Sequence, residues 1–505
     1  MRKAIRKIAG GMAILTAIAM LGGCGVKKDP EAGKSEEVIK TVEASKSEEQ
    51  VKKTDVPTLL WYIPGDTQTD LESINEAASR ITEEKIGAKI KMQFINDGSY
   101  GEKLSMINAA GEDYDLCWVG YLSTYVDNVK QGTLLDITDM LEDTPDLKAI
   151  MPETVWDSCK IEDRIYAVPN YQILCTTTGF SVNKELADKY NFDVSSITRT
   201  EDLEEFLQKV AENEKGIYPF RANWGVASFV EKGEAHTSAA KGQYLLGYVK
   251  EDGKVKVVPA YEYGHAKEKA KVLYDWYQKG YIREDSASVT DDSQDARAGK
   301  YAVQATAYKP GVEAEDAIYM GGEVYSVSLS KPILQQDSAR ATMLGIGANS
   351  KHPEEAMKFI ELINTDEELY NLICFGIEGK HYNKVGDNRI ELVENSGYNP
   401  NAAWKFGNQF NAYLQPGQAD DVWEQAKKIN ESAEKTPEFG FDPDYTDVKT
   451  QIAQCNTVIK EYNVMNKGAL DPDEYFDEFE KKLYEAGLQD VLDEIQSQLD
   501  EFFKQ

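Results

Sequence analysis

The sequence predicts an α/β fold that ends in a helical carboxyl-terminal extension. From residue 57 onward, short apolar or alternating runs of strand length are followed by segments in which apolar residues recur every three or four positions. This alternation is typical of a mostly parallel sheet with helices on both faces. The last hundred residues instead contain consecutive segments with helical periodicity. The two patterns together indicate an α/β body followed by helices.

The first unit begins with the buried strand TLLWYI over 58–63. A helix follows, because apolar residues recur at helical spacing from Leu71 to Ile81 and Gly87 ends the pattern. The next elements are a strand over 88–95, a helix near 99–110 and a strand over 115–119.

A second α/β unit follows the stretch IYAVPNYQILC at 165–175. Its expected helices lie near 200–213 and 264–279, and its expected strands include AGKYAVQAT. A further strand is expected over 340–348, and Pro353 opens a helix that continues through Leu369. In the extension, Asp471-Pro472 is typical of a helix start, and the last apolar stripe runs from Leu488 to Phe502.

The amino end has the pattern of a cleaved signal over residues 1–23. Four basic residues precede an apolar run from Ile8 to Leu21, which is shorter than the about 20 residues that a bilayer span needs. Leu21-Gly22-Gly23-Cys24 resembles a bacterial lipobox, in which Cys24 is diacylated, with palmitate-type chains, and becomes the new amino terminus. The alternative is an ordinary secretory signal with a chance cysteine.

Residues 24–56 are expected to form the lipidated cysteine and a disordered tether. The stretch after Cys24 has no aromatic residue and many charges, so it cannot bury enough surface to offset the entropy of ordering. Two acyl chains give stable anchoring where one is marginal. We therefore expect a protein held by lipid on the extracellular face of the cell membrane.

Size, charge and cysteine content narrow the class of protein. A chain of 505 residues is too long for one core and indicates two domains. The net charge of −31 argues against a nucleic-acid partner. Beyond Cys24 there are five cysteines, and an odd number without CxxC spacing is no disulfide framework, although a single disulfide stays open. These cysteines, expected mainly as buried apolar residues, are Cys117, Cys159, Cys175, Cys374 and Cys455.

No motif of an enzyme, metal site or cofactor site stands out in the sequence. The four histidines are not paired at metal-ligand spacing, and neither a GxSxG motif nor a P-loop is present. The run DPDEYFDEFEKK, residues 471–482, has the carboxylate density of a calcium loop but lacks its central glycine. We read it as a capped helix and expect no catalytic residue, metal or cofactor.

Aromatic residues near strand ends and in polar loops are candidates for a ligand site, and their chemistry would suit a sugar. Ligands of open α/β sheets bind beyond the carboxyl ends of strands, and a sugar needs aromatic rings for stacking and amides or carboxylates for its hydroxyls. For each tryptophan the alternative is a place in the core. The aromatic and amide candidates are Trp61, Tyr62, Trp118, Tyr171, Trp224, Trp404, Asn408 and Gln409.

Three charged residues complete the candidate set. Asp66 and Asp97 follow strands and could accept hydrogen bonds from hydroxyls, with helix capping as the alternative. Arg221 could hold a sugar carboxylate through its two-pronged guanidinium, with a solvated surface arginine as the alternative.

The chain resembles the solute-binding lipoproteins of ATP-binding-cassette importers, of the extracellular family 1 type that includes maltose-binding proteins. The resemblance rests on Cys24 and its tether and on LLWYIPGD, DRIYAVP, AGKYAVQAT and GIGANSKHPEEAMKFIELINTDEE. The carboxyl end, from NAAWKFGNQFNAYL onward, resembles a subgroup of aldouronate- or oligosaccharide-binding lipoproteins.

This resemblance implies a two-lobe fold of the periplasmic-binding-protein type II kind, with a hinged ligand cleft. Lobe 1 would comprise 57–168 plus 308–348, and lobe 2 would comprise 169–307 plus 349–505 with the helical extension. The implied function is capture of an oligosaccharide, with or without uronate residues, and its delivery to permease subunits by a monomer. The alternatives are the same fold binding a peptide or serving a sensor kinase, and a surface enzyme.

Overall fold

The computed structural model describes residues 56–175, 177–232, 245–263, 265–289 and 291–504. Contacts divide the chain into a unit before Asp55 and a unit from Asp55 to the end, and only the second is described here. The expected signal, Cys24 and the tether lie outside the described residues. Among the residues described, no helix has both the length and the apolar character needed to cross a membrane.

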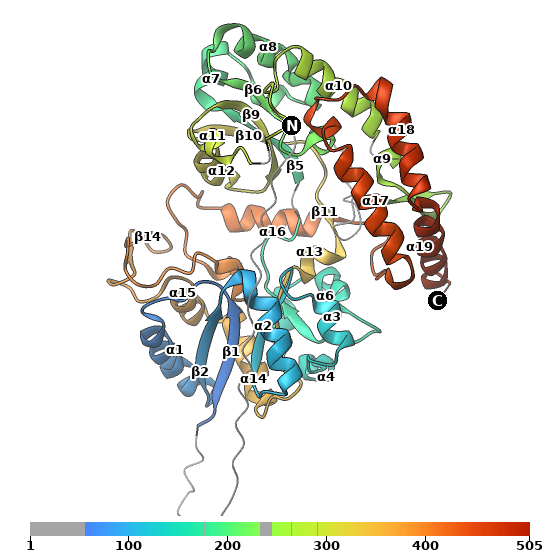
Figure 1. The fold of residues 1–505 in the computed structure, drawn as a ribbon. Helices are drawn as coiled ribbons and strands as arrows, with labels where there is room; N and C mark the ends of the chain where they lie inside the picture. Colours follow the sequence, from blue (N-terminus) through green and yellow to red (C-terminus); the bar gives the residue numbers. More distant parts are fainter. Residues whose placement is uncertain (1–55, 176, 233–244, 264, 290, 505) are drawn as a thin grey trace, which may run out of the picture. The chain divides into compact units, whose positions relative to one another are not determined.

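The first sheet has the strand order β2-β1-β3-β12-β4. Its strands β1 and β2 lie side by side in Figure 1. Strand β1 pairs in parallel with both β2 and β3, whereas β12 runs antiparallel to β3 and β4. The first three strands confirm the predicted order of elements. Their bounds are β1 Thr58–Pro64, β2 Lys89–Ile95, β3 Leu116–Gly120, β4 Ala167–Pro169 and β12 Thr342–Ile346.

Helices cover the first sheet and share its hydrophobic core. Helix α1 (Leu71–Ile86) ends at Gly87, whose left-handed backbone (φ 72°) closes the helix as predicted. The other long helices are α2 (Asp97–Ala110), α14 (Pro353–Thr365) and α15 (Glu367–Phe375). The shorter elements are α3 Tyr125–Lys130, α4 Thr138–Glu142, α5 Pro145–Ile150, α6 Glu153–Cys159, α13 Gln336–Arg340, β13 Tyr382–Lys384, β14 Ile390–Leu392, η5 Ala403–Lys405, η6 Gln409–Asn411 and α16 Val422–Ser432.

The second sheet has the order β10-β5-β9-β6 and a separate core around Phe180, Phe220 and Trp276. Of the neighbouring pairs in this sheet, β6 and β9 are parallel, whereas β5 is antiparallel to both β9 and β10. Its strands are β5 Thr177–Asn183, β6 Tyr218–Arg221, β9 Tyr301–Tyr308 and β10 Val324–Ser328. Its helical elements are α7 Lys184–Tyr190, η1 Val194–Ser196, η2 Thr200–Leu203, α8 Glu204–Asn213, η3 Gly225–Ser228, α10 Ala266–Gln278, α11 Ser293–Arg297 and α12 Val312–Met320.

The carboxyl-terminal extension is helical, as predicted. Asp471 caps α18 by accepting a hydrogen bond from the backbone N–H of Asp473, and Pro472 is the first helical residue. Helix α19 packs on the hairpin β7–β8 in a third hydrophobic cluster. The elements are η7 Thr446–Val448, α17 Lys449–Glu461, η8 Met465–Lys467, α18 Pro472–Glu485, α19 Leu488–Phe502, β7 Leu246–Glu251, β8 Lys254–Pro259 and α9 Ala260–Tyr263.

The division of the chain between the two sheets differs from the expectation in two segments. Residues 308–328, expected with the first lobe, continue the second sheet, because β9 and β10 both hydrogen-bond to β5. Residues 353–426, expected with the second lobe, contribute Phe359, Phe406 and Ala426 to the core of the first sheet. We therefore call the first sheet with its cluster lobe 1, and the second sheet with the extension lobe 2.

Three segments connect the lobes, and their described residues are 170–175, 329–335 and 433–445. The first overlaps the expected crossing at 168–171, whereas the other two differ from those expected at 307–309 and 348–351. The second contacts the start of β5, where Thr178 donates its backbone N–H to Ser330 Oγ at 2.7 Å. The last two pair as the short strands β11 (Ile333–Leu334) and β15 (Glu434–Lys435). All five cysteines after residue 24 are buried and free, so the disulfide that the sequence left open does not form.

Candidate functional site

The carboxyl ends of β1, β2 and β3 bring polar side chains together at one edge of the first sheet. Asp66 follows β1, Asn96 follows β2, and Tyr121 follows β3. Asn96 Nδ2 donates a hydrogen bond of 2.9 Å to Asp66 Oδ1. Asn96, and not Asp97, caps helix α2 by accepting from the backbone N–H of Gly98. The carboxylate of Asp97 is therefore available for another partner.

That partner is Lys405, a buried lysine that the sequence did not single out. Its side chain is only 5% exposed. Its ammonium donates to the Pro64 carbonyl at 3.0 Å and lies 3.2 Å from both oxygens of Asp97. The same ammonium lies 5.0 Å from the ring centroid of Trp404, within cation–π range. Lys405 thus ties the segment around Trp404 to the ends of β1 and β2.

Tyr121 and Trp404 form an aromatic pair that we call the platform. Their ring centroids lie 6.1 Å apart with the planes inclined by 35°. Tyr121 is 56% exposed and Trp404 is partly buried. Burial, and then the negative charge of Asp97, raise the pKa of Tyr121, so its hydroxyl stays protonated and can donate a hydrogen bond. The sequence identified Trp404 but missed Tyr121, whose only signal is its place directly after β3.

Trp61, Tyr62 and Trp118 belong to the core, so the prediction that they line the ligand site is wrong for this structure. Trp61 is completely buried, with T-shaped contacts to Phe359 and Phe406. Trp118 is also completely buried, and its indole N–H donates to Thr342 Oγ1 at 2.8 Å. Strands β1 and β3 are covered on both faces, so neither set of alternating side chains reaches solvent.

Tyr171 and Asn408 hold a turn in place rather than presenting free polar groups, and Gln409 joins the same turn through its backbone. Tyr171 is buried edge-on against Phe410, and burial raises its pKa. Its backbone carbonyl accepts from the N–H of Gln409 at 2.7 Å. The Asn408 side chain accepts from the N–H of Phe410 and donates to the Asn364 carbonyl. The polar side chains of Tyr171 and Asn408 thus have partners within the protein, whereas the half-buried amide of Gln409 stays a candidate.

In lobe 2, Arg221 ends β6, but its guanidinium already has partners. Nε and Nη2 contact Asp292 at 2.6 to 3.2 Å, and Nη1 donates to Gln304 Oε1 at 2.8 Å. Burial opposes ionisation of Asp292, but hydrogen bonds from Arg221 and Tyr301 hold the pKa of this carboxyl below its usual value. Arg221 is therefore neither the free partner for a sugar carboxylate that was expected nor the solvated surface arginine that was the alternative.

Asn223 and Trp224 follow β6 and form a second group that could contact a ligand. Trp224 is 38% exposed. The Asn223 amide donates to the Ala305 carbonyl at 3.1 Å, and its buried Oδ1 has no hydrogen-bond partner among the described residues. Gly225, with φ +56°, lets the chain pass Asn466, where an added Cβ would lie 2.7 Å from the Asn466 Cβ.

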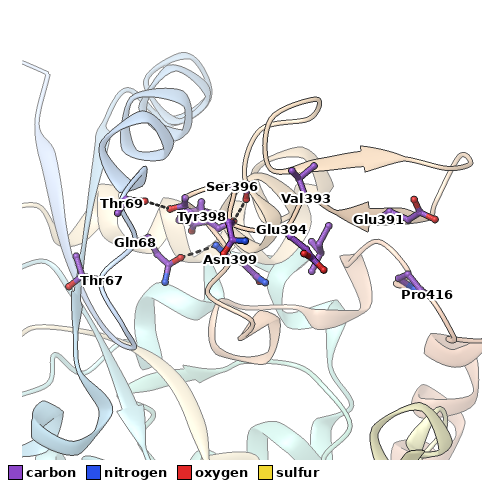
Figure 2. Close-up of a pocket in the computed structure, with 13 residues that line it drawn as sticks. Thr67, Gln68, Thr69, Glu391, Val393, Glu394, Ser396, Tyr398, Asn399 and Pro416 are labelled. Carbon is purple, nitrogen blue, oxygen red and sulfur yellow. Dashed lines mark hydrogen bonds between the residues drawn. The ribbon is translucent and has the colours of Figure 1, made fainter. Parts of the chain in front are cut away.

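A hollow of about 800 Å³ opens in lobe 1 beside Asp66, and we call it the polar hollow (Figure 2). One wall is the loop Thr67, Gln68 and Thr69, and the other is the segment 391–399 with Pro416. Within the described ranges, no group of three or more histidine, cysteine, aspartate or glutamate side chains is arranged to hold a metal ion.

Two family models match the chain. The model for bacterial extracellular solute-binding proteins matches residues 65–369, which is more than half of the sequence. A domain of unknown function matches residues 437–504, the helical extension. One similar protein is a carbohydrate ABC transporter substrate-binding protein of Streptococcus pneumoniae (serotype 4, strain ATCC BAA-334 / TIGR4). It is 29% identical over 461 residues, which cover 89% of this chain and 92% of the relative.

Solved structures give the same picture. The N-glycan transport solute binding protein of Streptococcus pneumoniae aligns with a TM-score of 0.77 at 28% identity, over 89% of this chain and 99% of that one. The same protein in complex with Man1GlcNAc aligns with a TM-score of 0.65 at 28% identity, over 89% of this chain and 100% of that one. In complex with Man5GlcNAc it aligns with a TM-score of 0.62 at 28% identity, over 89% of this chain and 99% of that one.

Tryptophans in the core and at the surface respond differently to truncation. We expect Trp61→Ala to lower the free energy of unfolding by about 3–5 kcal/mol, because it leaves a cavity beside Phe359 and Phe406. Trp224→Ala, the matched control at a partly exposed position, is expected to change it by less than about 1 kcal/mol. Urea unfolding of both variants checks this. Equal losses would contradict the placement of the two rings.

Proposed function

We propose that this chain, which belongs to the family of bacterial extracellular solute-binding proteins, captures a neutral oligosaccharide and delivers it to the permease of an ATP-binding-cassette importer. The observation that carries the proposal is the platform. An exposed tyrosine and a tryptophan backed by a buried ammonium lie beyond the carboxyl ends of parallel strands. A sugar ring can stack its C–H face on such rings while carboxylates and amides receive its hydroxyl groups.

The polar groups around the platform suit hydroxyls. The Asp66 carboxylate accepts one hydrogen bond from Asn96 and is exposed, so it can accept others, and the Tyr121 hydroxyl stays protonated. In lobe 2, Asn223 Oδ1 offers a buried acceptor next to the exposed ring of Trp224. Aromatic rings with neighbouring amide and carboxylate acceptors on both lobes could hold a sugar from two sides.

The charges favour a neutral sugar over a uronate. Lys405 is paired with Asp97, and Arg221 is paired with Asp292. Asp66 adds negative charge nearby, and so do two glutamates that line the polar hollow, Glu391 and Glu394. An anionic sugar would have to displace an existing ion pair or meet this negative field, and either costs binding free energy.

The relatives support the proposal and give probes for it. The relative of known class is a carbohydrate transporter component, and the similar structures hold Man1GlcNAc and Man5GlcNAc. The family is one of solute-binding transport proteins, and binding with release needs no covalent step. We infer that the chain returns its sugar unchanged and that the transporter's other subunits supply the energy.

The mechanism we propose is closure of the two lobes around the sugar. Ligand contacts made by both lobes favour the arrangement in which both can form. The three connecting segments are short, and Arg340 joins lobe 1 to the third of them through Asp442 at 2.8 Å. The streptococcal relative supports this, since the same protein aligns less well in its two glycan complexes than in the structure described without a glycan.

Closure predicts a smaller molecule when sugar is bound. We expect the radius of gyration of residues 57–505 to fall when Man5GlcNAc is added, measured by small-angle X-ray scattering. Trp404→Ala with the same glycan is the control, because it keeps the fold but loses platform contacts. A bound state of unchanged radius in the unmodified protein would rule out hinge closure.

The platform predicts which substitutions weaken binding. We expect Trp404→Ala and Tyr121→Ala each to weaken binding of Man5GlcNAc by about 2 kcal/mol, roughly thirtyfold, as for a central contact residue. Isothermal titration calorimetry measures this, and thermal unfolding confirms that the variants fold. Phe503→Ala, another half-exposed aromatic position, is the control. Full affinity in both platform variants would place the site elsewhere.

We also propose that the protein is a monomeric lipoprotein on the extracellular face of the membrane. The support comes from the sequence: the short apolar run, Leu21-Gly22-Gly23-Cys24 and the charged stretch behind it. The family is extracellular, which agrees with export. A tether of about thirty residues would let the binding unit reach a permease in the same membrane.

Loss of the acylated cysteine should release the protein. We expect Cys24→Ala to move the protein from the membrane fraction to the medium, or to leave the signal uncleaved. Gly25→Ala keeps the cysteine and is the matched control. Fractionation followed by mass spectrometry of the amino terminus distinguishes these results. A Cys24→Ala protein that is cleaved and still held in the membrane would overturn the lipid anchor.

A further inference from the structure

The polar hollow continues the platform, and we propose that it is a separate subsite that takes an extension or branch of a neutral oligosaccharide. This inference rests on the proposed function. Asp66, which accepts a hydrogen bond from Asn96 at the strand ends that carry the platform, is followed directly by Thr67, the first residue of the hollow's wall. Consecutive Cα atoms lie about 3.8 Å apart. A sugar that reaches Asp66 therefore comes within one residue of the hollow.

Hydrogen bonds join the two walls of the hollow (Figure 2). The backbone N–H of Asp70 and the hydroxyl of Thr69 both donate to the Gly397 carbonyl, at 3.0 and 3.1 Å. The N–H of Asn399 donates to Gln68 Oε1 at 2.8 Å. The hollow therefore exists before any ligand binds, and a ligand need not order its walls.

Gly397 allows this close approach. Its φ of +94° lies in the region that favours glycine, and an added Cβ would lie 2.8 Å from Asp70 Cγ and 2.9 Å from Thr69 Oγ1. Any larger residue would push the walls apart. The shape of the hollow thus depends on one position where the backbone and the neighbouring side chains both require glycine.

A buried histidine holds the side chain of Asp70, the residue that follows the first wall. The His381 side chain is fully buried, and its Nδ1 accepts from the N–H of Ile377 at 2.8 Å. Its Nε2 must then carry the proton and donate to Asp70 Oδ2 at 3.1 Å. Lys380 reaches the same oxygen at 2.6 Å, and hydrogen bonds from Lys380 and His381 hold the pKa of Asp70 below its usual value. Asp70 stays ionised and in place.

The lining matches a neutral polyhydroxy ligand. None of the residues that line the hollow is a lysine, arginine or histidine. Carboxylates, amides and hydroxyls alternate with a few apolar groups, which suits the hydroxyl rim and C–H faces of a sugar. Its volume of about 800 Å³ lies within the range of about 300–1,000 Å³ for small-molecule sites. The lining residues are Thr67, Gln68, Thr69, Glu391, Leu392, Val393, Glu394, Asn395, Ser396, Gly397, Tyr398, Asn399 and Pro416.

An anionic or phosphorylated ligand fits this hollow poorly. Glu391 and Glu394 are both exposed at its wall and would repel it. A peptide in extended form needs an unpaired strand edge or apolar pockets. The hydroxyl-rich, acidic lining favours sugar over both.

The test compares a short and a long glycan on the same variants. Glu394→Ala removes an acceptor from the wall, and Thr67→Trp fills the hollow. We expect each to weaken Man5GlcNAc binding about tenfold, as for loss of a hydrogen bond to a charged group, and to leave Man1GlcNAc within about twofold. Glu76→Ala, another exposed glutamate of lobe 1 that does not line the hollow, is the control and should change neither.

The outcomes separate this subsite from the platform. Trp404→Ala is expected to weaken both glycans, whereas the hollow variants weaken only the larger one. Equal weakening of both glycans, or none, in folded hollow variants would overturn the subsite and leave the proposed function standing. Failure of the unmodified protein to bind either glycan would count against the proposed function, and the subsite would fall with it. Calorimetry gives the affinities, and thermal unfolding shows that each variant folds.

Discussion

The buried ammonium of Lys405 is the interaction on which the lobe 1 site depends. A charge removed from water is tolerated only when it is paired and hydrogen-bonded, and this one has the Pro64 carbonyl and both oxygens of Asp97. Those partners stand at the ends of β1 and at the start of α2, while the lysine comes from a segment more than 300 residues later. The pairing therefore fixes where the late segment lies on the sheet edge, and with it the ring of Trp404.

Periodicity predicted the local structure well and the lobes only in part. The first three strands, α1 with its glycine end and the capped α18 follow from patterns within about fifteen residues. Which sheet a strand joins depends on partners far away in sequence. A strand is predicted from the stretch AGKYAVQAT. The stretch does not indicate, however, that this strand, β9, pairs with β5 and β6 rather than with the first sheet. The same holds for α14, whose apolar face fits either core until Phe359 meets Trp61.

The structure leaves some predicted site residues as candidates and places others in the core or in ion pairs. Asp66, Asp97, Trp224 and Trp404 lie beside or beyond strand ends or in polar loops, as expected, and remain candidates. Trp61 and Trp118 occupy the last half of strands that are covered on both faces, and sequence alone does not show that second cover. Lys405 and Arg221 look like surface cations until their acidic partners, Asp97 and Asp292, are placed beside them.

These ion pairs also affect how the protein can select an uncharged, hydroxyl-rich ligand. A cation that is already paired offers no free charge to a ligand. It contributes to the binding of a neutral sugar by fixing the orientation of neighbouring groups. Lys405 does this for Trp404, and Arg221 does it for Gln304 and Asp292. The Asp70–His381 pair does the same for the walls of the polar hollow. In each case a paired charge holds neighbouring groups in position, and recognition is left to ring faces, amides and hydroxyls. Such a surface discriminates by shape and by the direction of hydroxyl groups, which is what distinguishes one neutral oligosaccharide from another.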